Sequence, residues 1–265
     1  MRIFWLSLIP AVLLLFPPQL LAEPTNISIL TDGAALNQAG RQRMLSERMV
    51  KAYIQLAADI DTLKAEKQLR LARKLFTKQL ENLRHYAPTL RIQNNLRTVD
   101  ERWFELQAAL LSDEPLALQP MIALGEELVA ACHQVVLDIE AYAGTDSAVL
   151  VNISGRQRML SQRMAKYYFA HLSGENLEAI TVGFHNTLGE FERGLATLLS
   201  APQNSSEIQS ALSGVEAQLA FSKSGFRHLE SGEYTPHVIS RTTESMLKRM
   251  DDITGMYQRL HDKSV

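Results

Sequence analysis

The segment at residues 37–53, NQAGRQRMLSERMVKAY, returns later in the chain at residues 152–168 as NISGRQRMLSQRMAKYY. Twelve of the seventeen positions are identical at a constant offset of 115 residues, which is far beyond coincidence. Self-similarity at a fixed period is typical of a protein that is built from copies of one structural unit. The sequence therefore predicts two copies of one module, at residues 23–144 and 145–265.

Apolar residues in the repeated segment recur at intervals of three and four, which is the spacing of an amphipathic helix. The same periodicity continues through the rest of each copy, and short turn-forming stretches interrupt it. Short connections make neighbouring helices antiparallel, so the predicted fold class is all-α, with two tandem up-down four-helix bundle modules. The predicted helices are residues 32–60, 64–87, 90–111, 115–143, 146–172, 175–200, 204–230 and 236–262.

The first 22 residues have the pattern of an export signal. Arg2 supplies the positive start, an apolar stretch runs over residues 3–16, and the small residue Ala22 precedes Glu23. The apolar stretch is shorter than the roughly 20 residues that a membrane span needs. We therefore expect a signal peptide over residues 1–22 and a periplasmic location, with an uncleaved N-terminal membrane anchor as the alternative.

Composition and motifs exclude several classes of function. A net charge of −2 argues against a nucleic-acid partner, and 46% hydrophobic residues indicate a globular chain. The single cysteine, Cys132, excludes an internal disulfide and lies at helical spacing among apolar residues, which predicts a buried packing side chain. Paired histidines of a zinc site, a phosphate loop and a nucleophile motif are not found in the sequence, so no enzyme activity, catalytic residue, metal site or cofactor is predicted.

One face of the repeated helix is small or apolar except for a single arginine, Arg43 in the first copy and Arg158 in the second. Burial of a guanidinium is costly unless an anionic group meets it. Its planar fork suits a carboxylate, a phosphate or another planar oxyanion. Small residues one turn before and after each arginine allow a second helix to approach or can donate a hydrogen bond: Gly40, Gly155, Ser46 and Ser161.

An internal salt bridge is the alternative explanation for these arginines. Arg43 can pair with Glu47 four residues later, which is worth roughly a few tenths of a kcal/mol. The second copy has Gln162 at that position, so this pair does not explain why both copies carry the arginine. A carboxylate elsewhere in the bundle stays open as a partner.

The segments GRQRMLSERM and GRQRMLSQRM resemble the first-helix motif of the PilJ/NarX-like sensor module. This module forms the N-terminal periplasmic region of type IV pilus chemoreceptors and of nitrate/nitrite-sensing histidine kinases. The residues of both segments are closer to the pilus-receptor form of this motif than to its nitrate-sensor form. The nitrate-sensor pattern Gly-x-x-Arg-Met-x-Ser-x-Arg is matched by Gly40, Arg43, Met44, Ser46 and Arg48, and by Gly155, Arg158, Met159, Ser161 and Arg163.

The resemblance implies that Arg43 and Arg158 hold a small oxyanion where two first helices meet, with Arg48 and Arg163 as further anion contacts. Family members bring two first helices together by dimerisation. Two linked copies therefore predict that residues 32–60 and 146–172 pack as an internal pseudo-dimer. In that arrangement we expect Arg43 and Arg158 to face each other with no acid beside them.

Family members usually place the module between membrane spans, followed by cytoplasmic signalling domains. The sequence shows neither feature up to residue 265, so a membrane receptor or sensor kinase is expected as the partner. The leading hypothesis is an exported sensor-type protein for signal transduction that binds nitrate, nitrite or a similar oxyanion. The alternative is a structural or adaptor protein whose arginines pair internally or with a partner protein. No oligomeric state is predicted.

Overall fold

The computed structural model describes residues 30–174, 177–231 and 236–264, so the predicted signal peptide at residues 1–22 lies outside the described residues. Every regular element in these ranges is a helix, which confirms the all-α prediction. Among the described helices, none combines the length and the apolar character that a membrane crossing requires. The elements are α1 (Asp32–Ala57), α2 (Thr62–Tyr86), α3 (Leu90–Leu111), α4 (Leu118–Ala143), α5 (Asp146–Leu172), α6 (Leu177–Leu199), α7 (Ser206–Ser231) and α8 (Pro236–Ser264).

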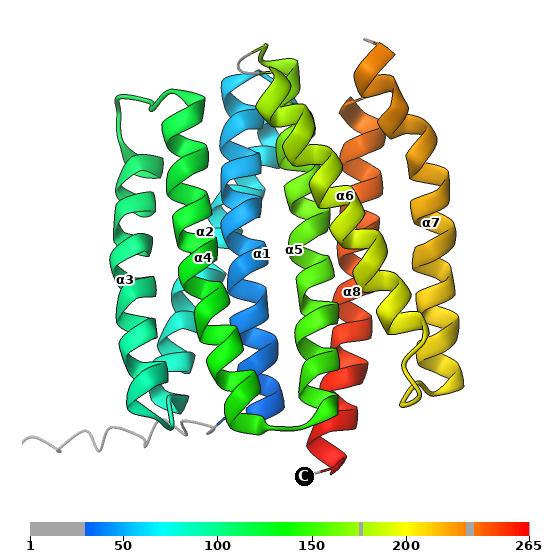
Figure 1. The fold of residues 1–265 in the computed structure, drawn as a ribbon. Coiled ribbons are helices and arrows are strands. Elements are labelled where there is room, and N and C mark those ends of the chain that lie inside the picture. Colours follow the sequence, from blue (N-terminus) through cyan, green and yellow to red (C-terminus); the bar gives the residue numbers. More distant parts are fainter. Residues whose placement is uncertain (1–29, 175–176, 232–235, 265) are drawn as a thin grey trace, which may run out of the picture.

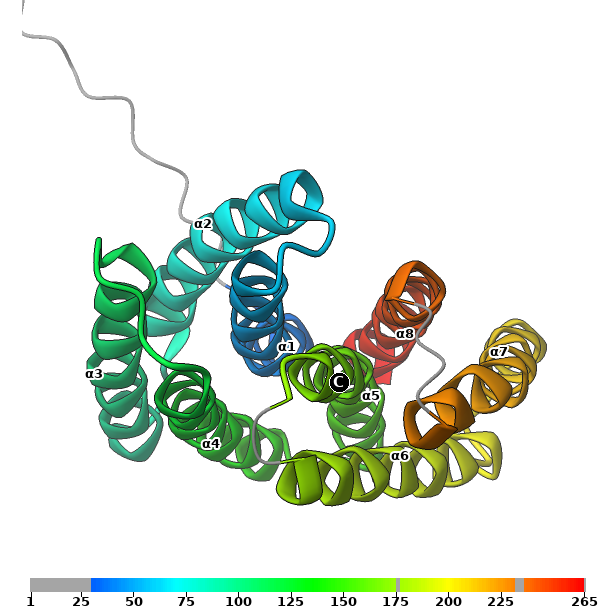
Figure 2. The ribbon, with the colours of Figure 1, turned by 90° about the horizontal axis from the view of Figure 1, so that it is seen from above.

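Two four-helix bundles, α1–α4 and α5–α8, lie side by side with α1 and α5 at their junction (Figure 1). Figure 2 shows α2, α3 and α4 on one side of this junction and α6, α7 and α8 on the other. The two central helices run parallel, because Gly40 lies beside Gly155 and, further along both helices, Lys51 bonds to Gln162. The predicted internal pseudo-dimer is therefore confirmed.

Local backbone chemistry moves some helix ends from their predicted positions. α1 ends at Ala57 rather than at residue 60, because Asp59 and Asp61 take positive φ angles of 55° and 48°, which end a right-handed helix. α4 begins at Leu118 rather than at residue 115. Pro120 therefore lies in the first turn, where its missing N–H has no helical partner to lose.

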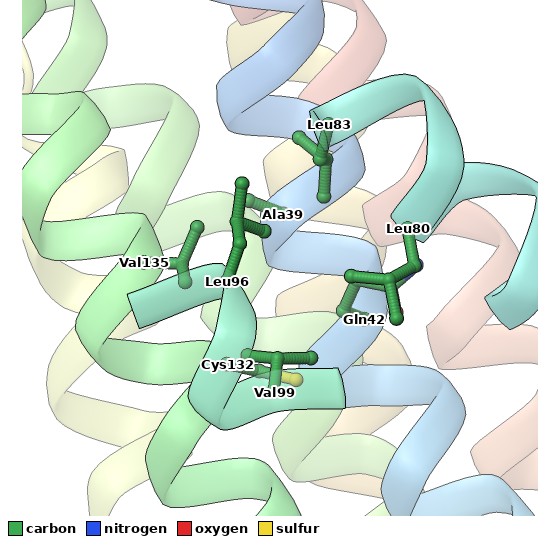
Figure 3. Close-up of a pocket in the computed structure, with 8 residues that line it drawn as sticks. All are labelled: Ala39, Gln42, Leu80, Leu83, Leu96, Val99, Cys132 and Val135. Carbon is green, nitrogen blue, oxygen red and sulfur yellow. The ribbon is translucent and has the colours of Figure 1, made fainter. Parts of the chain in front are cut away.

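The interior of the first bundle is filled by side chains from all its helices. The Phe76 and Trp103 rings pack with centroids 4.5 Å apart. Cys132 is 1% exposed, and burial raises the pKa of its thiol to about 12, so it is a packing residue as predicted. The space left in this interior has no room for a water molecule and therefore holds no ligand. Figure 3 shows the side chains around it: Ala39, Gln42, Leu80, Leu83, Leu96, Val99, Cys132 and Val135.

Candidate functional site

The junction of α1 and α5 brings the two predicted arginines together over a pair of glycines. A Cβ atom added to Gly40 would lie 3.8 Å from the Cα of Gly155. The same atom would lie 3.3 Å from Nη2 of Arg158 and 3.5 Å from Nη2 of Arg43, so both guanidiniums share the space beside the glycines. Both arginine side chains are completely buried. The four central residues of the predicted site therefore lie together.

Arg158 is neutralised by a carboxylate from α8. Its Nη1 donates to Oδ1 of Asp251 over 2.6 Å, and its Nη2 donates to the backbone oxygen of Asn37 over 3.1 Å. Burial tends to raise the pKa of Asp251, but the charges of Arg158 and of Arg41, which lies 2.7 Å away, hold it below its usual range. The expectation that no acid lies beside the arginines is therefore wrong for Arg158, because a helix outside the motif supplies one.

Arg43 makes its direct hydrogen bonds to groups without charge. Its Nη1 lies 3.0 Å from Nδ1 of His133, and its Nη2 donates to Oδ1 of Asn152 over 2.9 Å. Asn152 in turn donates to Oε2 of Glu140 over 2.7 Å, so the nearest carboxylate in this chain of bonds acts through an amide. Burial, followed by the charges of Arg156 and Arg158, lowers the pKa of Arg43 to about 9.

His133 is held in its neutral form by these surroundings. Because every N–H of Arg43 is a donor, Nδ1 of His133 must accept this hydrogen bond and therefore carries no proton. Burial first, and then the charges of Arg43, Arg156 and Arg163, lower the pKa of His133 to about 4. The imidazole is thus an acceptor for Arg43 at neutral pH and not a second cation.

This low pKa predicts that His133 makes the protein less stable as the pH falls. The unfolded chain binds a proton on His133 near pH 6.5, whereas the folded protein binds it only near pH 4. The unfolded state therefore holds more protons across this window, and the free energy of unfolding decreases from pH 6.5 towards pH 4. His133→Gln keeps an acceptor for Arg43 without titrating, so we expect a flatter profile from urea unfolding at several pH values. Superimposable profiles for the two proteins would contradict a neutral, buried His133.

The two serines of the predicted site bond within their own helices. Oγ of Ser46 donates to the backbone oxygen of Gln42 over 2.9 Å. Oγ of Ser161 donates to the backbone oxygen of Arg158 over 2.7 Å. Their hydroxyl protons therefore satisfy helix carbonyls and do not point to the arginine pair.

A second buried polar layer joins α1 to α5 further along both helices. Glu47 is 1% exposed and lies 2.5 Å from Nε of Arg163 and 3.0 Å from Nζ of Lys166. Nζ of Lys51 donates to Oε1 of Gln162 over 2.9 Å, and Gln162 is the repeat counterpart of Glu47. Burial tends to raise the pKa of Glu47, but Lys166 and Arg163 hold it below its usual range.

This layer accounts for the other two predicted arginines. Arg163 bonds to Glu47, and Arg48 bonds to Glu244 of α8. The structure therefore places Arg48 and Arg163 on carboxylates of the polar layer and not beside Arg43. The pair between Arg43 and Glu47 within α1, considered above as an alternative, is not among the contacts of Glu47, which reaches across to α5.

Sequence reasoning missed the direct partners of both arginines. Asn37 and Asn152 are identical in the two copies and begin the repeated segment, so the repeat itself carried a signal for them. His133 and Asp251 are different residue types on α4 and α8, where the two copies show no obvious identity. Their role as arginine partners can be recognised only from the packed structure of the two bundles.

A family model described as "PilJ: Type IV pili methyl-accepting chemotaxis transducer N-term" matches residues 25–124 and again residues 144–220. The chain belongs to the PilJ family. The two matches confirm the tandem copies, and each contains one of the two central helices with its arginine. No curated protein and no solved structure matches this chain.

The PilJ matches leave out most of α4 and all of α8, the last helix of each bundle. The first match ends at residue 124, near the start of α4, and the second ends at residue 220, within α7. Arg43 and Arg158 therefore lie inside the PilJ matches, whereas His133 and Asp251 lie outside them.

Proposed function

We propose that this PilJ protein is an exported sensor module that binds a small oxyanion, such as nitrate or nitrite, at the junction of α1 and α5. The family, described by the N-terminal region of chemotaxis transducers, supports a sensory role rather than an enzymatic one. The observation that carries the proposed site is Arg43, which is completely buried and bonds directly to an imidazole and an amide. An anion beside this guanidinium would compensate for the loss of its hydration.

The position of the proposed site also supports a way to report binding. The two proposed modules, residues 23–144 and 145–265, meet through α1 and α5. Arg43 lies on α1, so a ligand bound there lies at the contact between the modules. α1 also packs against α4, and α5 packs against α8. A ligand that favours one relative position of α1 and α5 would shift the outer helices with it. We propose a membrane receptor or sensor kinase as the partner that reads this shift.

Stabilisation by anions tests the proposed function. We expect the full chain to unfold at higher urea concentration in nitrate, nitrite or acetate than in chloride of equal ionic strength. A ligand at 100 times its dissociation constant adds about 2.7 kcal/mol to the free energy of unfolding. Arg43→Met is expected to remove this gain, because it keeps the length of the side chain but not the donors. Arg97→Met, at an exposed arginine of α3, is the control and should keep the gain.

A structural or adaptor role is the second candidate, and the Arg158–Asp251 pair at 2.6 Å favours it. In that role both arginines serve only to hold helices together. We then expect none of the anions to raise stability, and Arg43→Met to weaken the fold in all of them equally. The same titrations therefore separate the two candidates.

A further inference from the structure

The helices α4 and α8 occupy equivalent positions in the two copies. They begin at Leu118 and Pro236, and at this offset most of their buried positions coincide. Their hydrogen bonds coincide too, because Asn152 donates to Glu140 over 2.7 Å and Asn37 donates to Gln258 over 2.7 Å. The coinciding buried pairs include Met121 with Ile239, Leu128 with Met246, Val135 with Ile253, and Ile139 with Tyr257.

At the same offset, His133 is the counterpart of Asp251. Both meet the same atom of the equivalent arginine: Nδ1 of His133 lies 3.0 Å from Nη1 of Arg43, and Oδ1 of Asp251 lies 2.6 Å from Nη1 of Arg158. The second copy thus shows that a carboxylate oxygen fits this position beside a buried arginine. The first copy has a neutral ring there instead.

His133 and Asp251 differ in the interactions that must break before each side chain can leave its arginine. Removal of Asp251 from Arg158 would break ion pairs with both Arg158 and Arg41. Removal of the neutral His133 ring from Arg43 breaks one hydrogen bond and separates no opposite charges. His133 and Asp251 are both partly exposed, whereas the arginines that they contact are completely buried. Nε is a buried donor without a bond in both arginines of the described structure, so the two positions differ in the group at Nη1.

We infer that Asp251 acts as a tethered anion for Arg158, so that the chain binds one external anion, which replaces His133 at Arg43. This inference rests on the function proposed above and names the half of the junction that is open to a ligand. The ligand class follows from the Asp251 carboxylate, which the equivalent position already accepts. It comprises small planar oxyanions with at least two oxygens on one atom, represented by acetate, nitrate and nitrite.

Exchange of the two counterpart residues tests the inference by calorimetric titration of the full chain with sodium acetate and sodium nitrate. For the wild type we expect one binding site, which Arg43→Met removes. His133→Asp supplies Arg43 with its own carboxylate, and we expect it to weaken anion binding by about a hundredfold or more. His133→Gln is the matched control and should keep the site, because a neutral acceptor can still be displaced. A stronger response to acetate than to nitrate, or the reverse, identifies the better member of the ligand class.

The double exchange His133→Asp/Asp251→His moves the site and guards against a variant that merely fails to fold. It keeps one carboxylate and one imidazole at the junction, so we expect a folded protein with one site, now removed by Arg158→Met and not by Arg43→Met. Unchanged anion binding in His133→Asp, or a site in the double exchange that still depends on Arg43, would overturn the inference while leaving an anion sensor in place. A wild type that binds neither anion would instead overturn the proposed function itself.

Discussion

Glu47→Ala is expected to destabilise the folded protein by about 3–5 kcal/mol, the cost of leaving a buried charge without its partner. Glu47 is 1% exposed and lies within 3.0 Å of both Arg163 and Lys166. Lys166 is itself 1% exposed and retains only a longer contact with Glu126, at 3.4 Å, and a cation–π contact with the Tyr167 ring, 4.6 Å from its centroid. Loss of the Glu47 carboxylate therefore leaves positive charge buried at the junction of α1 and α5.

The second copy provides the control for this variant. Gln162 is the counterpart of Glu47, is also buried, and bonds to Lys51. Lys51 keeps the carboxylate of Glu244 at 2.7 Å when Gln162 is truncated, so Gln162→Ala is expected to cost only about 1–2 kcal/mol, from one hydrogen bond and some packing. Urea unfolding of the two variants measures the difference. Equal losses of stability would contradict the assignment of Glu47 as the anionic centre of this layer.

Gly40→Ala and Gly155→Ala are each expected to destabilise the protein by about 1–3 kcal/mol, because the added methyl group displaces a buried guanidinium from its packed position. An added Cβ on Gly155 would lie 3.2 Å from Nη2 of Arg158 and 3.9 Å from the Cα of Gly40. The contact with Gly40 is ordinary van der Waals packing, but the guanidinium would have to shift by a few tenths of an ångström while it is buried and bonded to Asp251. We also expect both variants to lose anion stabilisation, because the guanidiniums occupy the space that the methyl group would need.

Gly255→Ala separates this steric effect from the intrinsic preference of a helix for alanine. Gly255 lies in α8, and its added Cβ would meet only the end of the flexible Arg259 side chain, at 3.5 Å. Here we expect a gain of about 0.5–1 kcal/mol from the higher helix propensity of alanine. Thermal unfolding followed by circular dichroism compares the three variants. A gain of stability at Gly40 or Gly155 would contradict a tight crossing of the two helices.

The fold and half of the site could be predicted from the sequence because they depend on local or repeated signals. Helical periodicity fixes the elements, and the repeat of Gly40 and Arg43 as Gly155 and Arg158 predicts that two equivalent helices meet. The errors at helix ends were small and had local causes, such as the left-handed conformation of Asp61.

The partners of the arginines could not be predicted in the same way. His133 and Asp251 lie 90 and 93 residues from the arginines that they contact. Their positions depend on how α4 and α8 rotate to bury their apolar faces, and several residues on each helix are equally polar. The expectation of an acid-free arginine pair was wrong at Arg158 because the repeated segment contains no information about α8. Only the packing of all the helices around α1 and α5 identifies the acid.

The connection between α4 and α5 consists of Gly144 and Thr145, and it determines how the junction responds to dilution. A linker this short gives the tethered halves an effective concentration of about a millimolar or more. The junction therefore stays assembled in a nanomolar solution, in which separate modules of micromolar affinity would have dissociated. Because both halves belong to one chain, a substitution can also change one half and leave the other half unchanged. In a pair of identical chains, an aspartate at the position of His133 would enter both halves at once and place a carboxylate beside both arginines.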